Sequence, residues 1–211
     1  MKKITLGILI FASIILSGSC KNGKKSKSSN KFNTQQTQQT ISPEISSELL
    51  LAAKDGDLTN VKRYLDMGVD PNYTNEDGFN SLMLASYNGY VEIMKALINA
   101  GALVNVQNIA GRTPLMFASS GPFPEAVKYL IDQGANLDLI DSDQHFTALM
   151  FAGAEGQLEV VKILLEAGAN PYLTEVDNDT AESFAAANGH TEVVNYIKKF
   201  EKTHQKSEYN K

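Results

Sequence analysis

The sequence predicts an all-α solenoid of about five repeats, each made of two short antiparallel helices and a hairpin-like turn. The first observation is an alanine that recurs every 33 or 34 residues, at Ala52, Ala85, Ala118, Ala152 and Ala185. A glycine recurs with the same period at Gly68, Gly101, Gly134 and Gly168. Between these markers, apolar pairs lie one helical turn apart, as in Val160-Val161 with Leu164-Leu165, which is typical of an amphipathic helix. A fixed period of this length indicates an array in which each unit packs on its neighbours.

Residues 1–19 have the composition of a secretory signal peptide. Two lysines precede an apolar run from Ile4 to Leu16, and small residues follow it. The run is shorter than the roughly 20 apolar residues that span a bilayer, and its order of charged, apolar and small residues is that of a signal peptide. Residues 16–20, Leu-Ser-Gly-Ser-Cys, resemble a bacterial lipobox, although the leucine stands four residues before the cysteine instead of three. This predicts lipid attachment at Cys20; cleavage by an ordinary signal peptidase, which would release a soluble protein, is the alternative.

Residues 20–44 are predicted to form a disordered tether. They contain lysines and the Thr/Gln-rich stretch 34–40, with almost nothing that a core could bury,. The lysines could lie on anionic lipid headgroups, or the segment is simply a solvated spacer.

The charge of the chain is unevenly divided. The net charge is −5, but residues 46–211 contain 12 basic and 23 acidic residues, a net charge of −11. A surface of this sign repels phosphate backbones, so we expect no nucleic-acid partner and a protein partner with a basic patch. Cys20 is the one cysteine of the chain, so packing must stabilise the fold without an internal disulfide.

Each repeat has recognisable start and stop signals. The first helix is expected to open at a capping side chain, which accepts a hydrogen bond from a backbone N–H of the first turn; these residues are Ser47, Asn80, Thr113, Thr147 and Thr180. The second helix is expected to end at the recurring glycine, which tolerates the left-handed conformation. The predicted repeats are 46–76, 77–109, 110–142, 143–176 and 177–200, within a domain 45–200. A solvated outer face is expected on the last repeat, where Glu182 replaces a core leucine, and the polar tail 201–211 is expected to fray.

Three stretches resemble parts of the ankyrin repeat. Gly111-Arg112-Thr113-Pro114-Leu115-Met116-Phe117-Ala118 matches its opening, residues 188–194 its middle and residues 134–138 its close. The resemblance covers about residues 46–200 as five units, and it implies a protein-binding array whose concave surface consists of the turn tips and the exposed side of the first helices.

The chain departs from the family pattern at several positions. Met83, Met116 and Met150 stand where the family often has a histidine, so we expect apolar packing in place of that histidine's hydrogen bond. His145 and Asn178 stand where the turn glycine would be, which leaves the shape of those two turns open. Pro122 replaces a glycine between helices and predicts a stiffer turn in the third repeat.

Few residues match catalytic or metal-binding patterns, so we expect neither an enzyme nor a cofactor. His190 fits a structural position of the family, and His145 beside Asp143 lacks the burial and the orienting third group that acid/base catalysis needs. The carboxylates at Asp138, Asp141 and Asp143, and at Glu175, Asp177 and Asp179, lack the spacing of a calcium loop. They are predicted to be solvated turn residues.

Binding is therefore the expected activity. The resemblance places the residue before each cap on the solvent-facing side of the turn, and these residues are Phe79, Arg112, Phe146 and Asp179. Aromatic and arginine side chains are favoured at binding hot spots. The predicted partner-binding residues are Phe79, Tyr87, Asn88, Ile109, Arg112, Asp143, Phe146 and Glu155. The alternative for the two phenylalanines is that they pack against neighbouring hairpins and stiffen the array.

The expected protein is thus an exported, lipid-anchored, monomeric interaction module of the bacterial cell envelope, at the periplasmic face or the cell surface. Two other functions stay open. One is an accessory or immunity-type protein that neutralises one secreted enzyme or toxin, and the other is a structural spacer without a specific ligand.

Overall fold

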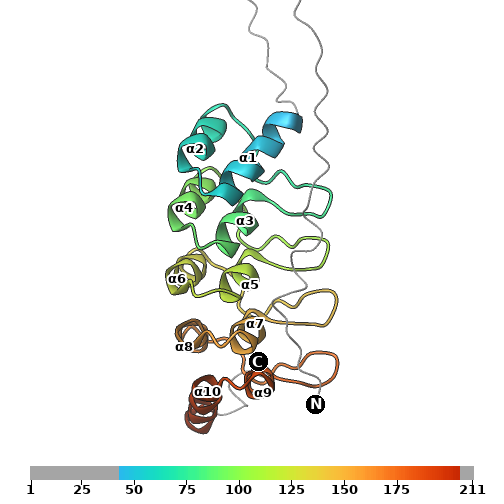
Figure 1. Ribbon diagram of the computed structural model, residues 1–211, viewed down its shortest axis with the longest axis vertical. Coiled ribbons are helices and arrows are strands. Elements are labelled where there is room, and N and C mark those ends of the chain that lie inside the picture. Colours follow the sequence, from blue (N-terminus) through green and yellow to red (C-terminus); the bar gives the residue numbers. More distant parts are fainter. Residues whose placement is uncertain (1–42, 205–211) are drawn as a thin grey trace, which may run out of the picture.

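The computed structural model describes residues 43–204, and these residues form ten α-helices and no strand (Figure 1). The predicted signal peptide, the lipid-attachment residue Cys20 and nearly all of the predicted tether lie outside this range, as do residues 205–211. The helices are α1 Pro43–Asp55, α2 Leu58–Asp66, α3 Ser81–Tyr87, α4 Val91–Asn99, α5 Pro114–Ser119, α6 Pro124–Asp132, α7 Ala148–Ala154, α8 Leu158–Glu166, α9 Ala181–Asn188 and α10 Thr191–Thr203.

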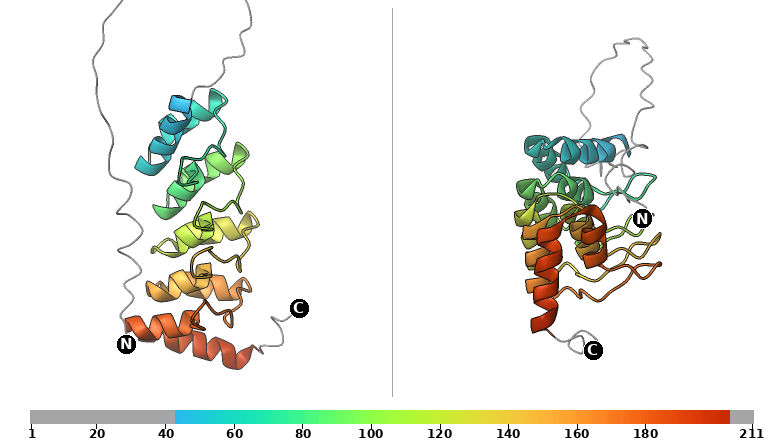
Figure 2. Two further views of the ribbon diagram at one scale, coloured as in Figure 1. Left: turned by 90° about the vertical axis from the view of Figure 1, so that its right-hand side faces the viewer. Right: turned by 60° about the horizontal axis from the view of Figure 1, so that its bottom comes forward.

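The helices stack as five antiparallel pairs in one column. The first helices α1, α3, α5, α7 and α9 form one row, and the second helices α2, α4, α6, α8 and α10 form a row beside it (Figure 1). Each helix packs against its partner in the pair and against the equivalent helix of the next pair. The hairpin turns all project to the same side of the column (Figure 2). The predicted all-α solenoid of five repeats is confirmed.

The core lies between the two rows of helices. The recurring alanines are buried at every repeat, so the first helices can approach closely there. Leucines at equivalent positions, Leu82, Leu115 and Leu149, are each at most 1% exposed. Burial of such a side chain stabilises the fold by roughly 1.5–3 kcal/mol, and the array has one such layer in each of its three inner repeats.

Four of the five predicted caps are confirmed. The side chains of Asn80, Thr113, Thr147 and Thr180 each accept a hydrogen bond from the backbone N–H three residues later. The prediction for Ser47 is wrong, because α1 begins at Pro43 and the Ser47 hydroxyl, inside the helix, donates to the carbonyl of Pro43. Proline suits the first turn of a helix. The negative charge of Glu44, in the same turn, interacts favourably with the positive end of the helix dipole,.

The methionines in the first helices have a polar role that the sequence did not predict. The sulfurs of Met116 and Met150 accept the backbone N–H of the capping threonine at 3.4 and 3.5 Å. In the last repeat the Ser183 hydroxyl accepts the equivalent N–H at 2.7 Å. The expectation of purely apolar packing at Met116 and Met150 is therefore corrected. The backbone N–H of the capping threonine and that of the methionine three residues later both bond to side chains of the same repeat.

The two turns without glycine nevertheless form. His145 and Asn178 both have φ 66°, the left-handed conformation that Gly78 and Gly111 adopt in the earlier turns. The extra residue of the array lies in the third turn, where Asp141 N donates to Phe146 O across five residues. The other turns close across four residues, as between Asn75 and Phe79.

The array extends slightly beyond the predicted domain at both ends. The first helix starts at Pro43, and α10 continues to Thr203. The Tyr172 hydroxyl donates to the carbonyl of His204 at 3.0 Å, which holds the end of α10 against the preceding link. Glu182, on the outer side of the last repeat, pairs with Lys198 at 3.2 Å, so this carboxylate is compensated where the inner repeats bury leucine.

Candidate protein-binding surface

Each hairpin turn is built around one polar side chain at its start. These residues are Asn75, Asn108, Asp141 and Glu175, and their side-chain oxygens accept backbone N–H groups from the other end of the turn. Asp141 and Glu175 are only 1% and 6% exposed. The prediction that they are solvated carboxylates is therefore wrong, because their oxygens replace water with backbone donors.

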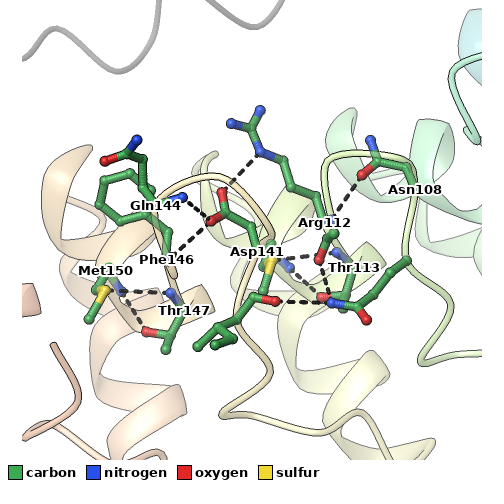
Figure 3. Close-up of polar contacts among 12 residues, drawn as sticks. Asn108, Arg112, Thr113, Asp141, Gln144, Phe146, Thr147 and Met150 are labelled. Atoms are coloured by element: carbon green, nitrogen blue, oxygen red, sulfur yellow. Dashed lines mark hydrogen bonds and ion pairs between the residues drawn. The ribbon is translucent and has the colours of Figure 1, made fainter. Parts of the chain in front are cut away.

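Arg112 and Asp141 join the second and third turns (Figure 3). Arg112 Nε lies 3.5 Å from Asp141 Oδ2, while Asp141 Oδ1 accepts the backbone N–H groups of Gln144 and Phe146. The guanidinium also lies over the ring of Phe151, 5.5 Å from its centre. Its terminal nitrogens point away from the helices (Figure 3), so Arg112 is fixed on one side and open to a ligand on the other.

A row of aromatic rings lies under the turns. The residue before each cap packs on a phenylalanine in the first helix of the next repeat. Phe79 lies on Phe117 at 5.4 Å between ring centres, and Phe146 lies on Phe184 at 5.0 Å; the guanidinium of Arg112 over Phe151 completes the series. Neighbouring repeats are thus fixed to one another along this face.

Backbone hydrogen bonds link the turn tips into a continuous edge. The N–H groups of Ile109, Ser142 and Val176 donate to carbonyls of the preceding turn at 3.2, 2.9 and 3.1 Å. Ile109 and Val176 expose apolar side chains, with 73% and 48% of their surface accessible. The tips therefore form a stiff ledge with apolar side chains on it.

The turns carry nearly all of their charge as carboxylates. Residues 70–79, 103–112, 136–146 and 170–179 contain nine Asp and Glu residues and one basic residue, Arg112. Of the ten Lys and Arg residues within 43–204, eight lie on the second helices. The turn edge is therefore acidic, whereas the second helices, with eight basic and eight acidic residues, have no net charge.

A scan against protein-family models matches ankyrin repeats, in a three-copy description, to residues 49–141, 83–175 and 124–208. The matches together cover most of the chain and nearly all of the described helices. The chain belongs to the ankyrin-repeat family. No curated protein matched the chain in a sequence comparison. Ankyrin repeats generally mediate protein–protein interaction, so a protein partner is the expected ligand of this array.

The ankyrin array exposes the predicted binding residues very unequally. Ile109 and Asp143 lie exposed on the turn tips, and Arg112 is half-buried with the exposed fraction of its side chain at 22%. Phe79, Tyr87 and Glu155 are half-buried. The rings of Phe79 and Tyr87 both pack on Phe117, and Glu155 occupies the C-cap position of α7.

Two predicted residues serve the ankyrin stack itself. Phe146 is only 6% exposed, between the rings of Phe151 and Phe184. The expectation that it faces solvent is therefore wrong, since the next repeat covers it. Asn88 donates to the carbonyls of Leu84 and Lys54, at 3.0 and 3.4 Å, and so ties the second repeat to the first.

Sequence reasoning missed the helix residues that face the turns. They recur with the repeat period as Leu51, Leu84, Phe117, Phe151 and Phe184. The signal was available, because three successive phenylalanines at one repeat position indicate a common structural role. The buried partner of Arg112, Asp141, could not be found from spacing, since it depends on how two turns pack.

Four further observations concern the described part of the chain. No helix within residues 43–204 is long and apolar enough to cross a membrane, and no group of three or more His, Cys, Asp or Glu residues there could hold a metal ion. A hollow of about 500 Å³ lies at the C-terminal end of the ankyrin array, lined by Tyr196, Phe200 and His204 among others. A smaller hollow, of about 200 Å³, lies between the first two repeats.

Proposed function

We propose that this ankyrin-repeat protein is a non-catalytic interaction module that binds a basic surface of a partner protein along its turn edge. The observation that carries the proposal is the uneven charge: seven exposed carboxylates against one arginine on the turns, beside the exposed Ile109 and Val176. Charges of one sign on a rigid edge steer a partner of the opposite sign and fix its orientation. The apolar tips supply the desolvated contacts from which most affinity comes.

The role of Arg112 in this proposal is specificity. It is a cation on an otherwise acidic edge, and Asp141 and Phe151 hold it in place. A fixed guanidinium favours a partner that presents a carboxylate or a backbone carbonyl at that point, and it disfavours a uniformly basic surface. The proposed partner surface is therefore basic where it faces the carboxylates around Arg112, and neutral or acidic at the point that faces Arg112 itself.

We further propose that the protein is exported and anchored in a bacterial cell envelope through lipid on Cys20. The support is the sequence of residues 1–20 alone, in which an apolar run leads to a lipobox-like cysteine. Inhibition of lipoprotein signal peptidase with globomycin tests this: accumulation of the unprocessed precursor is expected, and normal processing would point to a released soluble protein.

The binding proposal is tested by charge reversal on the turn tips. Asp77 and Asp143 are exposed, and their side chains take part in no hydrogen bond or ion pair shown within residues 43–204. Asp77→Lys with Asp143→Lys should weaken capture of the partner from envelope extract by at least about tenfold, which corresponds to about 1.4 kcal/mol. Quantitative mass spectrometry of the captured proteins gives the measurement.

The matched control changes the same charge on the other side of the array. Asp66 and Asp132 are exposed aspartates in the second helices α2 and α6, and Asp66→Lys with Asp132→Lys should leave capture unchanged. Equal losses in both variants would mean that net charge, not the turn edge, governs binding.

The captured proteins also separate the alternative functions. One stoichiometric partner would favour an immunity-type role, and no reproducible partner would favour a spacer.

A further inference from the structure

The hollow between the first two repeats lies on the face that carries the aromatic row. It measures about 200 Å³ and is lined by Ser47, Leu50, Leu51, Lys54, Asn75, Phe79 and Leu84. Leu51 is 48% exposed, whereas Leu84, Phe117, Phe151 and Phe184 at the equivalent position in later repeats are at most 9% exposed. The first repeat thus leaves open an apolar surface that the other repeats cover.

The hollow exists because one covering side chain is missing. From the third repeat onward, the residue before the cap in the preceding repeat lies over this helix position, as Phe79 does on Phe117. For Leu84, in the second repeat, that residue would come from a hairpin in front of the first repeat. In this chain the equivalent residue, Ser46, lies inside α1 and is not part of a turn. The missing group has the size of a ring or an arginine, and it would come from the chain that precedes α1.

The surface next to the hollow is acidic. Leu51 also borders a second hollow, whose lining includes Glu48, Asp55 and Asp57. Among residues 43–204, Lys54 is the one basic residue that lines either of these two hollows, and Asp57 accepts hydrogen bonds from Asn60. An apolar side chain that follows a basic segment is therefore complementary to this end of the array.

The chain itself carries such a segment directly before α1. Phe32 is the one aromatic residue between Lys21 and Pro43, and five lysines precede it at positions 21, 24, 25, 27 and 31. Ten residues, 33–42, separate it from α1, and they can span up to about 33–36 Å. The hollow lies four to eleven residues into α1, which is roughly 6–17 Å along the helix. The ring of Phe32 is within reach.

We propose that Phe32 occupies this hollow in the same molecule, with the lysines before it against Glu48, Asp55 and Asp57. The segment then lies where the residue before the cap lies in later repeats, and it covers Leu51. A short linker gives an effective concentration in the millimolar range, so even a weak contact is populated. This inference does not depend on the identity of the partner.

A single tryptophan tests the contact, because the chain contains none. In the full chain in detergent, Phe32→Trp should show blue-shifted emission and weak quenching by acrylamide. Adding Leu51→Asp should move the emission to that of an exposed indole and restore quenching. Leu51→Ala, which introduces no charge, should shift it in the same direction. Far-UV circular dichroism checks that the helices remain.

The matched control is Leu103→Asp. Leu103 is 59% exposed and lies away from the hollow, so this change should leave the emission of Trp at position 32 unshifted. Emission of an exposed indole in the otherwise unchanged chain would overturn the proposal. A blue shift that Leu51→Asp does not abolish would place the ring elsewhere, in detergent for example, and would also overturn it. Loss of the blue shift and of the protection from acrylamide when the protein is diluted would mean that position 32 of a second copy of the chain occupies the hollow. That result would overturn occupation within the same molecule.

Discussion

Replacing Asp138 by asparagine is expected to stabilise the protein. The links between second helices and turns are joined by a repeated side-chain bridge. In it Asn72 accepts the N–H of Leu103 at 2.8 Å and donates to the carbonyl of Gly101 at 2.9 Å. Asn105 makes the same two bonds one repeat later. Asp138 occupies the next position and accepts the N–H of Asn170 at 2.9 Å, but a carboxylate cannot donate to the carbonyl of Gly168.

The expected gain follows from the missing donor. One added hydrogen bond contributes about 0.5–1.5 kcal/mol net. Asparagine also removes a charge that is costly in the fold, since burial raises the pKa of Asp138 above its ordinary value. Because the residue is exposed over more than a third of its surface, this electrostatic contribution is small. The predicted total is therefore close to that of the hydrogen bond alone, about 1 kcal/mol.

The sign of the pH dependence is also fixed. A raised pKa means that the folded state holds the proton of Asp138 more tightly than the unfolded state does. The stability from this group is thus present at low pH and is lost as pH rises from the unfolded to the folded pKa,. The advantage of Asp138→Asn should therefore be largest at neutral pH and smaller below the ordinary aspartate value of 3.8.

Urea unfolding followed by far-UV circular dichroism measures the effect as a higher midpoint at an unchanged slope. The control is Asp143→Asn, which makes the same charge change at an exposed turn position. A loss of stability at neutral pH, or an equal gain in the control, would refute the hydrogen-bond argument.

Substitutions at three further positions test the turns and the rings. Asp141→Ala should lower the free energy of unfolding by about 2–4 kcal/mol, because it leaves buried donors unpaired. Asp141→Asn retains an acceptor and should cost less than about 1 kcal/mol; equal costs in urea unfolding would show that the arginine pair, not the turn, dominates. Phe146→Ala should cost about 3–5 kcal/mol, as for other buried phenylalanines, and a cost below about 1 kcal/mol in the same titration would show that its ring is not part of the core. Gly111→Ala should lower the thermal midpoint, because φ is 73° there, which costs an alanine roughly 1–2 kcal/mol, and because the added Cβ would lie 2.5 Å from the backbone N of Ser142; an unchanged midpoint would contradict this.

The local signals in the sequence predicted most of the fold. Polar caps such as Thr113 and Thr147 fix the helix starts through bonds within three residues, so the sequence alone determines them. The recurring glycines end the second helices for the same local reason. The start of α1 was missed at Ser47 because α1 already begins at Pro43, so the cap position of the later repeats lies inside the helix in the first repeat.

The candidate site was harder to predict because its exposure depends on packing between repeats. Phe79 and Phe146 occupy equivalent repeat positions, yet Phe79 is half-buried and Phe146 is buried. The difference follows from what lies around them: Phe146 contacts both Phe151 and Phe184, in its own and the next repeat. The exposure of Ile109 and Asp143 could be predicted without knowing how the repeats pack, because the tip of a turn is exposed whatever its neighbours are.

Site-specific photo-crosslinking in cells that produce the protein tests the central claim most directly. A photoreactive phenylalanine analogue is placed at Ile109 on the turn edge, or at the exposed Lys128 on the second helix α6. We predict one discrete protein adduct from position 109 and none from position 128. Adducts from position 128 alone, or none from either position, would contradict binding along the turn edge.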